Sequence, residues 1–249
     1  MACVEVENVS LTYPIYGASA RSFRSTLLNV ATGGRLNKTK SSMFVEALKN
    51  ISFKLEKGDR LAIIGHNGAG KSTLLKVLAK IYEPVTGTVH VQGRVNSLFD
   101  IMMGMDQELN GYENIKLRSL ILGLSKAETQ KIIPHIETFA ELGDFMKMPI
   151  KSYSSGMKVR LAFGIITHVF SDILLIDEIV NVGDAKFLEK AKAQMLHLIN
   201  RADFVVLSTH DVNIVKELCN KALWLDKGNI RCMGSVDQVL EMYLSTTFN

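Results

Sequence analysis

The order of apolar and polar positions along the chain predicts short buried strands that alternate with amphipathic helices. Compact apolar runs predict buried strands at 60–64, 173–176 and 204–207, and looser alternation predicts further strands at 4–13, 51–55 and 88–95. Apolar residues at helical spacing predict helices at 125–142, 154–170, 186–201 and about 236–244, with a hairpin at 224–232. This alternation is typical of an α/β fold with a mainly parallel sheet.

A further helix is expected to begin at Lys71, directly after a glycine-rich turn. Pro134 should split or kink the helix at 125–142, because proline lacks an N–H and crowds the preceding turn. Ser154 is placed to cap the helix that follows it. The buried side of the helix at Lys71 should consist of Leu74, Leu75, Leu78, Ile81 and Tyr82.

The composition is that of an ordinary globular protein, with 47% hydrophobic and 22% charged residues in a chain of 249. The most apolar stretch, 161–176, contains His168, Ser171 and Asp172 and is shorter than the roughly 20 apolar residues of a membrane span, so we expect no span. The net charge of +4 is compatible with a nucleic acid, an anionic lipid or a nucleotide as ligand. Three cysteines without paired or metal-like spacing favour a reducing compartment.

One long segment near the N-terminus is basic. It runs from Asn8 to Val45 without an acidic residue and contains Arg21, Arg24, Arg35, Lys38 and Lys40. Within it Phe23, Leu27 and Val30 share one helical face, a layout typical of an interfacial helix that packs at a membrane or on a partner. The alternative is a solvated surface loop, as charge runs usually are.

The strongest chemical signal is a phosphate-binding loop that matches G-x-x-x-x-G-K-[ST]. Glycines let backbone N–H groups curl around phosphate oxygens, and the N-terminus of the following helix adds positive potential. A lysine at this position reaches the β- and γ-phosphates, and the next hydroxyl can ligate Mg²⁺. The loop consists of Gly65, His66, Asn67, Gly68, Ala69, Gly70, Lys71 and Ser72.

Two carboxylates follow the apolar strand at 173–176. Asp177 is placed to ligate Mg²⁺ between phosphates, and Glu178 to polarise a water for attack on the γ-phosphate. Taken alone, such a pair usually marks a strand that runs into a solvated turn. The phosphate-binding loop favours the catalytic interpretation.

Two further segments are weaker signals. The small residues of Tyr153-Ser154-Ser155-Gly156-Met157 open a helix, where they form either an anion site or an ordinary N-cap. Ser208-Thr209-His210-Asp211 follows the strand at 204–207, where a lone histidine is more often structural than catalytic.

The order of these motifs resembles the ABC ATPase cassette over essentially the whole chain. The resemblance implies a P-loop NTPase core with a mainly parallel sheet, an antiparallel β subdomain and a helical signature subdomain. It implies a single ATPase domain at 1–249, with the helical subdomain at about 98–170 and a basic insertion at 14–46. ATP and Mg²⁺ are the implied ligands, and hydrolysis of ATP is the implied activity.

The resemblance also implies roles for single residues. Glu178, His210 and Lys71 would be catalytic, Ser72 and Asp177 would hold the metal, and Asp184 would be the D-loop aspartate that links two subunits. Thr73 would join the phosphate-binding loop in binding nucleotide, and either Tyr13 or Phe44 would stack on adenine. The signature that contacts ATP on the partner subunit would be Ser154, Ser155, Gly156 and Met157.

Two departures from the family pattern stand out. Ser155 and Met157 replace the usual glycine and glutamine of the signature, whereas Ser154 and Gly156 keep the residues expected at phosphate. Asp100 lies at about the position of the usual Q-loop glutamine.

Several segments resemble a narrower group, the ATP-binding subunits of O-antigen, capsule and teichoic-acid exporters. They are 108–115, 153–157, 177–187 and the basic insertion. This resemblance implies a homodimer under two separate membrane-spanning permease subunits, at the cytoplasmic face of the inner membrane, exporting a polysaccharide and binding no nucleic acid. The alternatives are an ABC cassette for another substrate, or a soluble ABC protein acting on nucleic acid or ribosomes. The latter usually has two cassettes or a long coiled coil.

Overall fold

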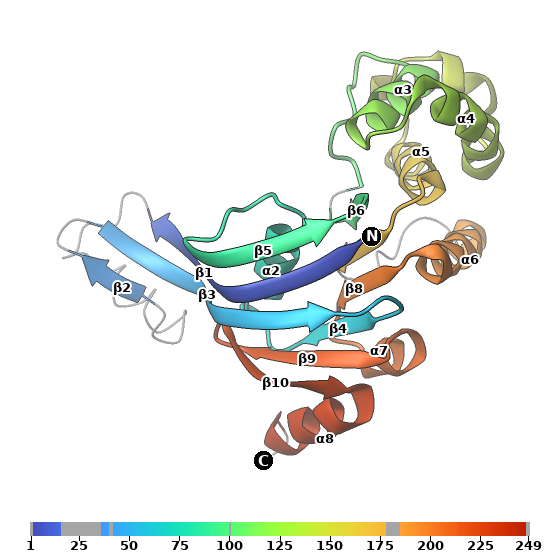
Figure 1. The fold of residues 1–249 in the computed structure, drawn as a ribbon. Helices are drawn as coiled ribbons and strands as arrows, with labels where there is room; N and C mark the ends of the chain where they lie inside the picture. The colour runs from blue at the N-terminus through green and yellow to red at the C-terminus, as the bar shows by residue number, and fades with distance from the viewer. Residues whose placement is uncertain (1, 16–35, 40–41, 100, 178–184, 248–249) are drawn as a thin grey trace. The chain divides into compact units, whose positions relative to one another are not determined.

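The computed structural model describes residues 2–15, 36–39, 42–99, 101–177 and 185–247. These residues divide into two compact units (Figure 1). The first unit takes its residues from 1–92, 176–178 and 204–249, and the second from 93–175 and 179–203. The chain therefore leaves the first unit and returns to it. Asp177 belongs to the first unit, as the phosphate-binding loop does.

An antiparallel sheet forms one layer of the first unit. Its strands, in spatial order, are β2 (Leu36–Thr39), β3 (Ser42–Leu55), β1 (Cys3–Ile15) and β5 (Thr86–Gln92). In the β1–β3 register Val4 lies opposite Leu55 and Val6 opposite Phe53, and all four side chains are buried. Residues two apart share one face of a strand, so this alternation turns one side of β1 and β3 towards the core.

The other layer of the first unit contains four strands in the order β10-β9-β4-β8. Strand β4 pairs in parallel with both β8 and β9, and β9 forms an antiparallel hairpin with β10. Helix α2 contacts β8 of this layer and β3 and β5 of the other, so it packs between them. The elements are β4 (Arg60–Ile64), α2 (Lys71–Leu78), β8 (Phe204–Ser208), α7 (Val212–Leu218), β9 (Lys221–Asp226), β10 (Asn229–Ser235) and α8 (Val236–Thr247).

The second unit is mainly helical. Its hydrophobic core joins α3, α4 and α5 with the 3₁₀ turns between them and includes the fully buried Ile115, Ile136, Met146 and Ile165. Its elements are β6 (Val95–Leu98), α3 (Gly111–Ile121), α4 (Lys126–Ala140), the turns Gly143–Lys147 and Ile150–Ser152, α5 (Ser155–His168) and α6 (Ala185–Arg201). Strand β7 (Ile173–Asp177) begins in this unit and ends in the first.

Most predicted elements are present, with three corrections. Helix α4 continues unbroken through Pro134, whose own carbonyl accepts a hydrogen bond of 2.9 Å from the Thr138 hydroxyl. Helix α2 ends at Leu78, so Ile81 lies beyond it and is 47% exposed, against the prediction that it belongs to the buried stripe. The strand predicted at 88–95 is instead two strands, β5 and β6, which belong to different units.

Only part of the basic insertion is described. Strand β2 pairs with the beginning of β3 as a short antiparallel ribbon. The predicted interfacial helix with Arg21, Phe23, Arg24, Leu27 and Val30 lies outside the described residues. Of the helices that the structure does describe, none has both the length and the hydrophobicity needed to cross a bilayer.

Candidate functional site

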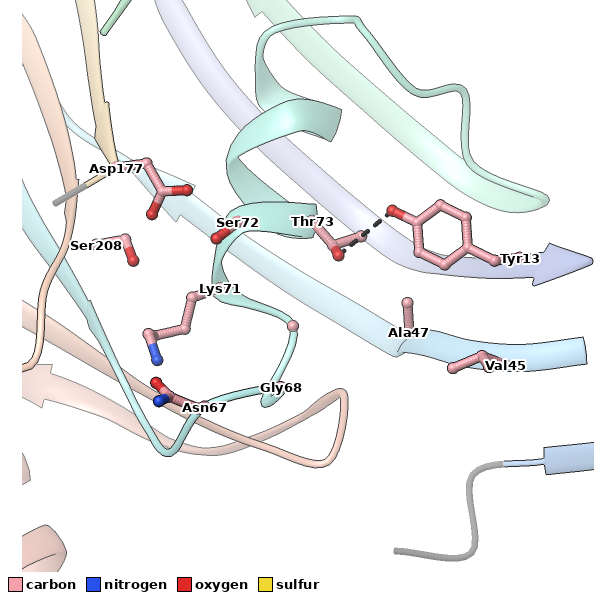
Figure 2. A pocket seen from close by; sticks show the side chains of 11 residues that line it. Tyr13, Val45, Ala47, Asn67, Gly68, Lys71, Ser72, Thr73, Asp177 and Ser208 are labelled. Atoms are coloured by element: carbon pink, nitrogen blue, oxygen red, sulfur yellow. Dashed lines mark hydrogen bonds between the residues drawn. The ribbon is translucent and has the colours of Figure 1, made fainter. Parts of the chain in front are cut away.

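One pocket in the first unit brings most of the predicted nucleotide-binding residues together. It has a volume of about 520 Å³, within the range of small-ligand sites. Figure 2 shows Ser72, Asp177 and Ser208 towards one end of the pocket and Tyr13 towards the other. The lining residues are Tyr13, Val45, Ala47, Asn67, Gly68, Gly70, Lys71, Ser72, Thr73, Asp177 and Ser208.

The path of the phosphate-binding loop requires glycine at two positions. Gly65 has φ +146°, and a Cβ added there would lie 2.1 Å from the carbonyl oxygen of Leu225 on β9. Gly70 has φ +110°, and its added Cβ would lie 2.7 Å from the carbonyl oxygen of Ala47. Since real Cβ atoms do not approach backbone oxygen so closely, the loop can lie against β3 and β9 only with glycines at both positions.

The loop itself holds the lysine that follows it. Lys71 is buried, and its Nζ donates hydrogen bonds of 2.7 Å to the Gly65 carbonyl and 3.1 Å to the His66 carbonyl. The ammonium group is thereby fixed over the concave side of the loop, where backbone N–H groups and the start of α2 add to the positive potential. This arrangement suits a polyphosphate.

A set of oxygen ligands lines the same pocket. Ser72 is an exposed residue in the first turn of α2, and Asp177 is a half-buried residue at the end of β7. A hydroxyl and a carboxylate are ligands that Mg²⁺ prefers. The Oγ atom of Ser208 is buried and has no hydrogen-bond partner in the described part of the chain, so the pocket also offers an unsatisfied hydroxyl. These residues fit a divalent cation bound together with a phosphate group.

Tyr13 forms the aromatic part of the pocket. Its hydroxyl donates a 3.3 Å hydrogen bond to Oγ1 of Thr73, and its ring packs edge-on against Tyr82 at 5.5 Å. Burial raises the pKa of the Tyr13 phenol above its usual value, so the group is neutral at physiological pH. Tyr13 lies opposite Val45 in the β1–β3 register, and both line the pocket. Phe44, the competing aromatic, does not line it, since neighbouring residues on a strand point to opposite faces.

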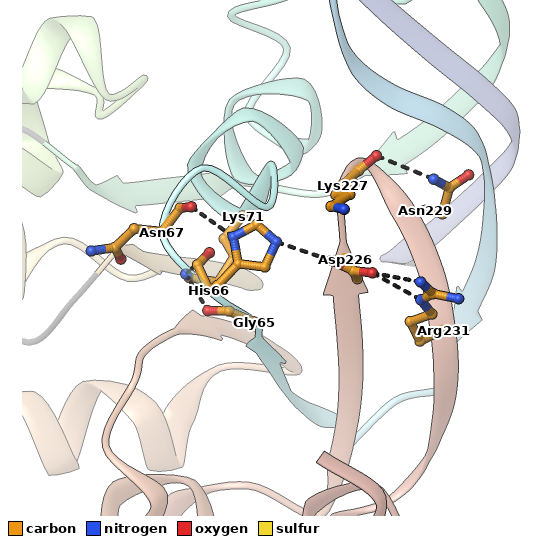
Figure 3. A network of polar contacts seen from close by, with 8 residues as sticks. All are labelled: Gly65, His66, Asn67, Lys71, Asp226, Lys227, Asn229 and Arg231. Carbon is orange, nitrogen blue, oxygen red and sulfur yellow. Dashed lines mark hydrogen bonds and ion pairs between the residues drawn. The ribbon is translucent and has the colours of Figure 1, made fainter. Parts of the chain in front are cut away.

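A polar network outside the pocket supports the loop from the β9–β10 hairpin (Figure 3). Nδ1 of His66 lies 2.7 Å from the carbonyl oxygen of Asn67, and Nε2 lies 2.9 Å from Oδ1 of Asp226. The other carboxylate oxygen of Asp226 accepts hydrogen bonds of 2.9 and 2.7 Å from Arg231. Gly228 adds a backbone bond of 2.9 Å to the Ala69 carbonyl. The loop is therefore held in shape by residues far along the chain.

The four signature residues lie at the beginning of α5 in the second unit. Ser154, Ser155 and Gly156 are exposed and Met157 is half-buried. Ser154 caps the helix, as predicted, by accepting a hydrogen bond of 3.3 Å from the Met157 backbone N–H. A Cβ added at Gly156 would meet nothing within 4 Å. Packing inside the subunit therefore does not require glycine at this position.

Several predicted residues are not part of the pocket. His210 is exposed in the turn after β8 and does not line it. Glu178, Asp184 and Asp100 lie outside the described residues. Sequence reasoning missed Val45, Ala47 and Ser208. Of these three, only Ser208 could have been identified from the sequence. It is a polar residue at the end of an otherwise apolar strand, directly before the segment that contains the predicted catalytic residue His210.

Comparisons with known proteins point to one family. The profile of the family described as "ABC transporter" matches residues 48–181. The O-antigen export system ATP-binding protein RfbE of Yersinia enterocolitica is 46% identical, over 92% of this chain and 97% of that protein. The teichoic acids export ATP-binding protein TagH of Shouchella clausii is 41% identical over 79% of this chain, which spans about half (54%) of that protein. A solved structure of the "ATP binding subunit of ABC transporter" shares the fold, with a TM-score of 0.71 at 21% identity, covering 97% of this chain and 93% of that one.

Proposed function

This chain belongs to the ABC transporter family, and on that premise we propose that it is the ATP-hydrolysing subunit of a polysaccharide exporter. The observation that carries the ATPase part is the pocket in which Lys71, Ser72 and Asp177 meet. The cargo is inferred from the relatives, which are named for export of O-antigen and teichoic acids. The proposal treats 1–249 as one ATPase domain, with the helical signature subdomain at about 98–170 inside the second unit.

Most residues of the pocket would have a role in binding ATP. Lys71 and the loop 65–70 would hold the β- and γ-phosphates, with Thr73 beside them at the start of α2. Tyr13 would stack on the adenine ring, because it is the aromatic side chain of β1 that lines the pocket. Ser72 and Asp177 would hold Mg²⁺, which when bound neutralises charge on the phosphate oxygens.

Hydrolysis then requires an oriented water. Glu178 directly follows Asp177, and we assign it the general base that takes a proton as the water oxygen attacks the γ-phosphorus. The bond to the β–γ bridging oxygen breaks, and ADP and phosphate are released. His210 would contact the γ-phosphate within the same subunit. The buried hydroxyl of Ser208 at the end of the neighbouring strand lines this part of the pocket as well.

The active unit would be a homodimer. Each chain contains one phosphate-binding loop and one signature, and the exposed Ser154, Ser155 and Gly156 are accessible to a partner's nucleotide. Backbone N–H groups at the beginning of α5 suit a phosphate contact. Asp184 would connect the two composite sites. The dimer would sit at the cytoplasmic face of the inner membrane under two permease subunits, through which a lipid-linked polysaccharide is exported.

The proposal is tested by deleting the gene in the source cell and measuring surface polysaccharide. Deletion should abolish surface polymer and leave lipid-linked polymer inside the cell, and the wild-type gene should restore export. Lys71→Ala should fail to restore it, whereas Lys116→Ala, which removes an exposed lysine from α3, should succeed. If the purified protein hydrolyses ATP but its deletion leaves surface polymer unchanged, the ATPase assignment holds and the cargo is wrong.

A further inference from the structure

A second pocket, of about 470 Å³, lies wholly within the second unit and shares no residue with the first. It lies between the first half of α4, the end of α5 with the residues that follow it, and the end of α6. Six of its lining side chains are basic or histidine: Arg94, Lys131, His135, His168, His197 and Arg201. Three of the six histidines of the chain therefore line this one pocket.

The positive charge of this pocket is poorly compensated. Glu128 is the one carboxylate among its lining residues. The Oε2 atom of Glu128 already accepts hydrogen bonds of 2.7 Å from the backbone and the hydroxyl of Ser125, and its Oε1 lies 3.5 Å from both terminal nitrogens of Arg94. Within the described part of the chain, Lys131 forms no ion pair, and the guanidinium of Arg201 lies over the Phe170 ring at 5.4 Å. Of the three cations, only Arg94 thus contacts the carboxylate, and at a long distance.

Polar groups deeper in the pocket can orient a ligand. Ser171 is 1% exposed, and its hydroxyl has no partner among the residues that the structure describes. The Nδ1 atom of His168 donates a 2.7 Å hydrogen bond to the Gly164 carbonyl, so the neutral ring keeps Nε2 as an acceptor. The ring of His135 stacks on that of His168 at 6.3 Å. Apolar contact is also present on the walls, from Leu124, Ile132 and Phe170.

The chemistry of the lining residues selects among possible ligands. In the described chain no group of three histidine, cysteine or acidic side chains could hold a metal ion, so the three histidines are not a metal site. A concave set of arginine and lysine side chains favours a phosphate group, which guanidinium can bind with two parallel hydrogen bonds. A hydroxyl and an imidazole acceptor beside apolar walls suit the organic part of an ester.

We propose that this pocket binds the phosphate group of a small soluble phosphate ester through Arg94, Lys131 and Arg201. The site goes beyond the proposed ATPase function, since the ATP of that function is held by the other unit's loop. Arg201 and Lys131 come from α6 and α4, and Arg94 precedes β6, so a bound phosphate would join three segments of the unit.

The test uses inorganic pyrophosphate as the probe, with the first pocket saturated by a non-hydrolysable ATP analogue. Nitrogen-15 NMR of the histidine rings reports both sites, because His66 lies on the loop and His135, His168 and His197 line the second pocket. Pyrophosphate should shift the three pocket signals saturably, with a Kd of about 1 mM or below, and should leave His66 unchanged. The double variant Lys131→Gln, Arg201→Gln should weaken binding about tenfold or more, equivalent to about 1.4 kcal/mol.

Lys126→Gln is the matched control, since it removes an exposed lysine from the same helix α4 outside the pocket. It should bind pyrophosphate like the wild type. Thermal unfolding should show that all variants fold, because the two substituted pocket residues are exposed. The proposal would be overturned if pyrophosphate caused no saturable shift of the three pocket histidines. It would also be overturned if the double variant bound pyrophosphate as tightly as the wild type. A shift with phosphatidylglycerol vesicles but none with pyrophosphate would overturn it as well, and would identify a lipid headgroup as the ligand.

Discussion

Nε2 of His66 lies 2.9 Å from Oδ1 of Asp226, although 160 residues separate the two in the chain. The contact connects the phosphate-binding loop to the β9–β10 hairpin. Burial by itself would raise the pKa of the Asp226 carboxyl, but the hydrogen bonds from Arg231 and His66 outweigh it and lower the pKa. The carboxylate is therefore ionised at physiological pH and can hold both partners. The geometry of the nucleotide pocket depends in this way on the C-terminal part of the first unit.

Asp226→Asn should weaken nucleotide binding although Asp226 does not line the nucleotide pocket. The amide keeps the size of the side chain but loses the charge that holds His66 and Arg231. We expect several-fold weaker binding of an ATP analogue, measured by calorimetry, and a loss of about 0.5–1.5 kcal/mol in the free energy of unfolding. Asp144→Asn, which alters an exposed aspartate of the second unit, is the control. Unchanged nucleotide affinity in Asp226→Asn would show that the loop keeps its shape without this contact.

Gly65→Ala should damage the fold of the loop more than a comparable substitution elsewhere. Both Gly65 and Gly58 have positive φ, but an added Cβ meets the Leu225 carbonyl oxygen at 2.1 Å in the first case and nothing within 4 Å in the second. Gly58→Ala therefore measures backbone strain alone. We expect Gly65→Ala to lose about 2 kcal/mol or more of stability beyond Gly58→Ala, and to lose ATP binding. Equal unfolding midpoints for the two variants in a denaturant titration would contradict this account.

Much of the first unit could be predicted because local signals agree there. The five residues of β4 are nearly all buried, the glycines follow at once, and α2 begins at Lys71, so strand, turn and helix each have their own signature. The hairpin at Lys227-Gly228 was predicted equally well, because glycine favours the positive φ that Gly228 adopts in its turn. The contact of this hairpin with the phosphate-binding loop could not be predicted, because the pair of His66 and Asp226 is formed only in the tertiary structure.

Helix α3 shows why the second unit was harder to predict. It buries Gly111, Asn114 and Arg118, while Leu120 and Ile121 are 71% and 62% exposed. Apart from Ile115, its buried side is therefore not apolar, and hydrophobic periodicity cannot detect it. The Asn110–Glu113 capping box was the available signal. Helix α7 was missed for a simpler reason: its seven residues give too short a pattern to recognise.

His168 should make the stability of the protein depend on pH. Burial lowers the pKa of His168 below the usual value of about 6.5. The hydrogen bond to the Gly164 carbonyl opposes this shift, whereas the nearby His135, His197 and Lys190 lower the pKa further. The unfolded chain then takes up a proton at a pH where the folded chain does not. The contribution of neutral His168 to the free energy of unfolding should be fully present above about pH 6.5. It should be lost as the pH falls from there to the pKa of His168 in the folded protein. His168→Gln should flatten that part of the curve in urea titrations at pH 7.5 and 5.5, whereas parallel curves would exclude this origin.

Glu178→Gln should separate binding from hydrolysis. The amide keeps the shape of the side chain but cannot accept the proton of the attacking water, so turnover should fall by roughly 10²-fold or more. ATP affinity should remain close to that of the wild type, because Lys71 and the loop bind the phosphates. The measurement is steady-state phosphate release alongside binding of an ATP analogue. Near-normal turnover would remove Glu178 from the role of general base.

Gly156→Ala gives the clearest test of a site shared between two subunits. The added Cβ meets nothing within 4 Å in its own chain, and alanine favours a helix over glycine by about 1 kcal/mol, so the variant should be at least as stable as the wild type. If Gly156 lies against the partner's nucleotide, turnover should nevertheless fall about tenfold or more. Mixing Lys71→Ala with Ser154→Arg subunits should then restore part of the activity, because some dimers keep one intact site. Wild-type turnover in Gly156→Ala, or activity that does not depend on protein concentration, would instead place the whole catalytic site within one chain.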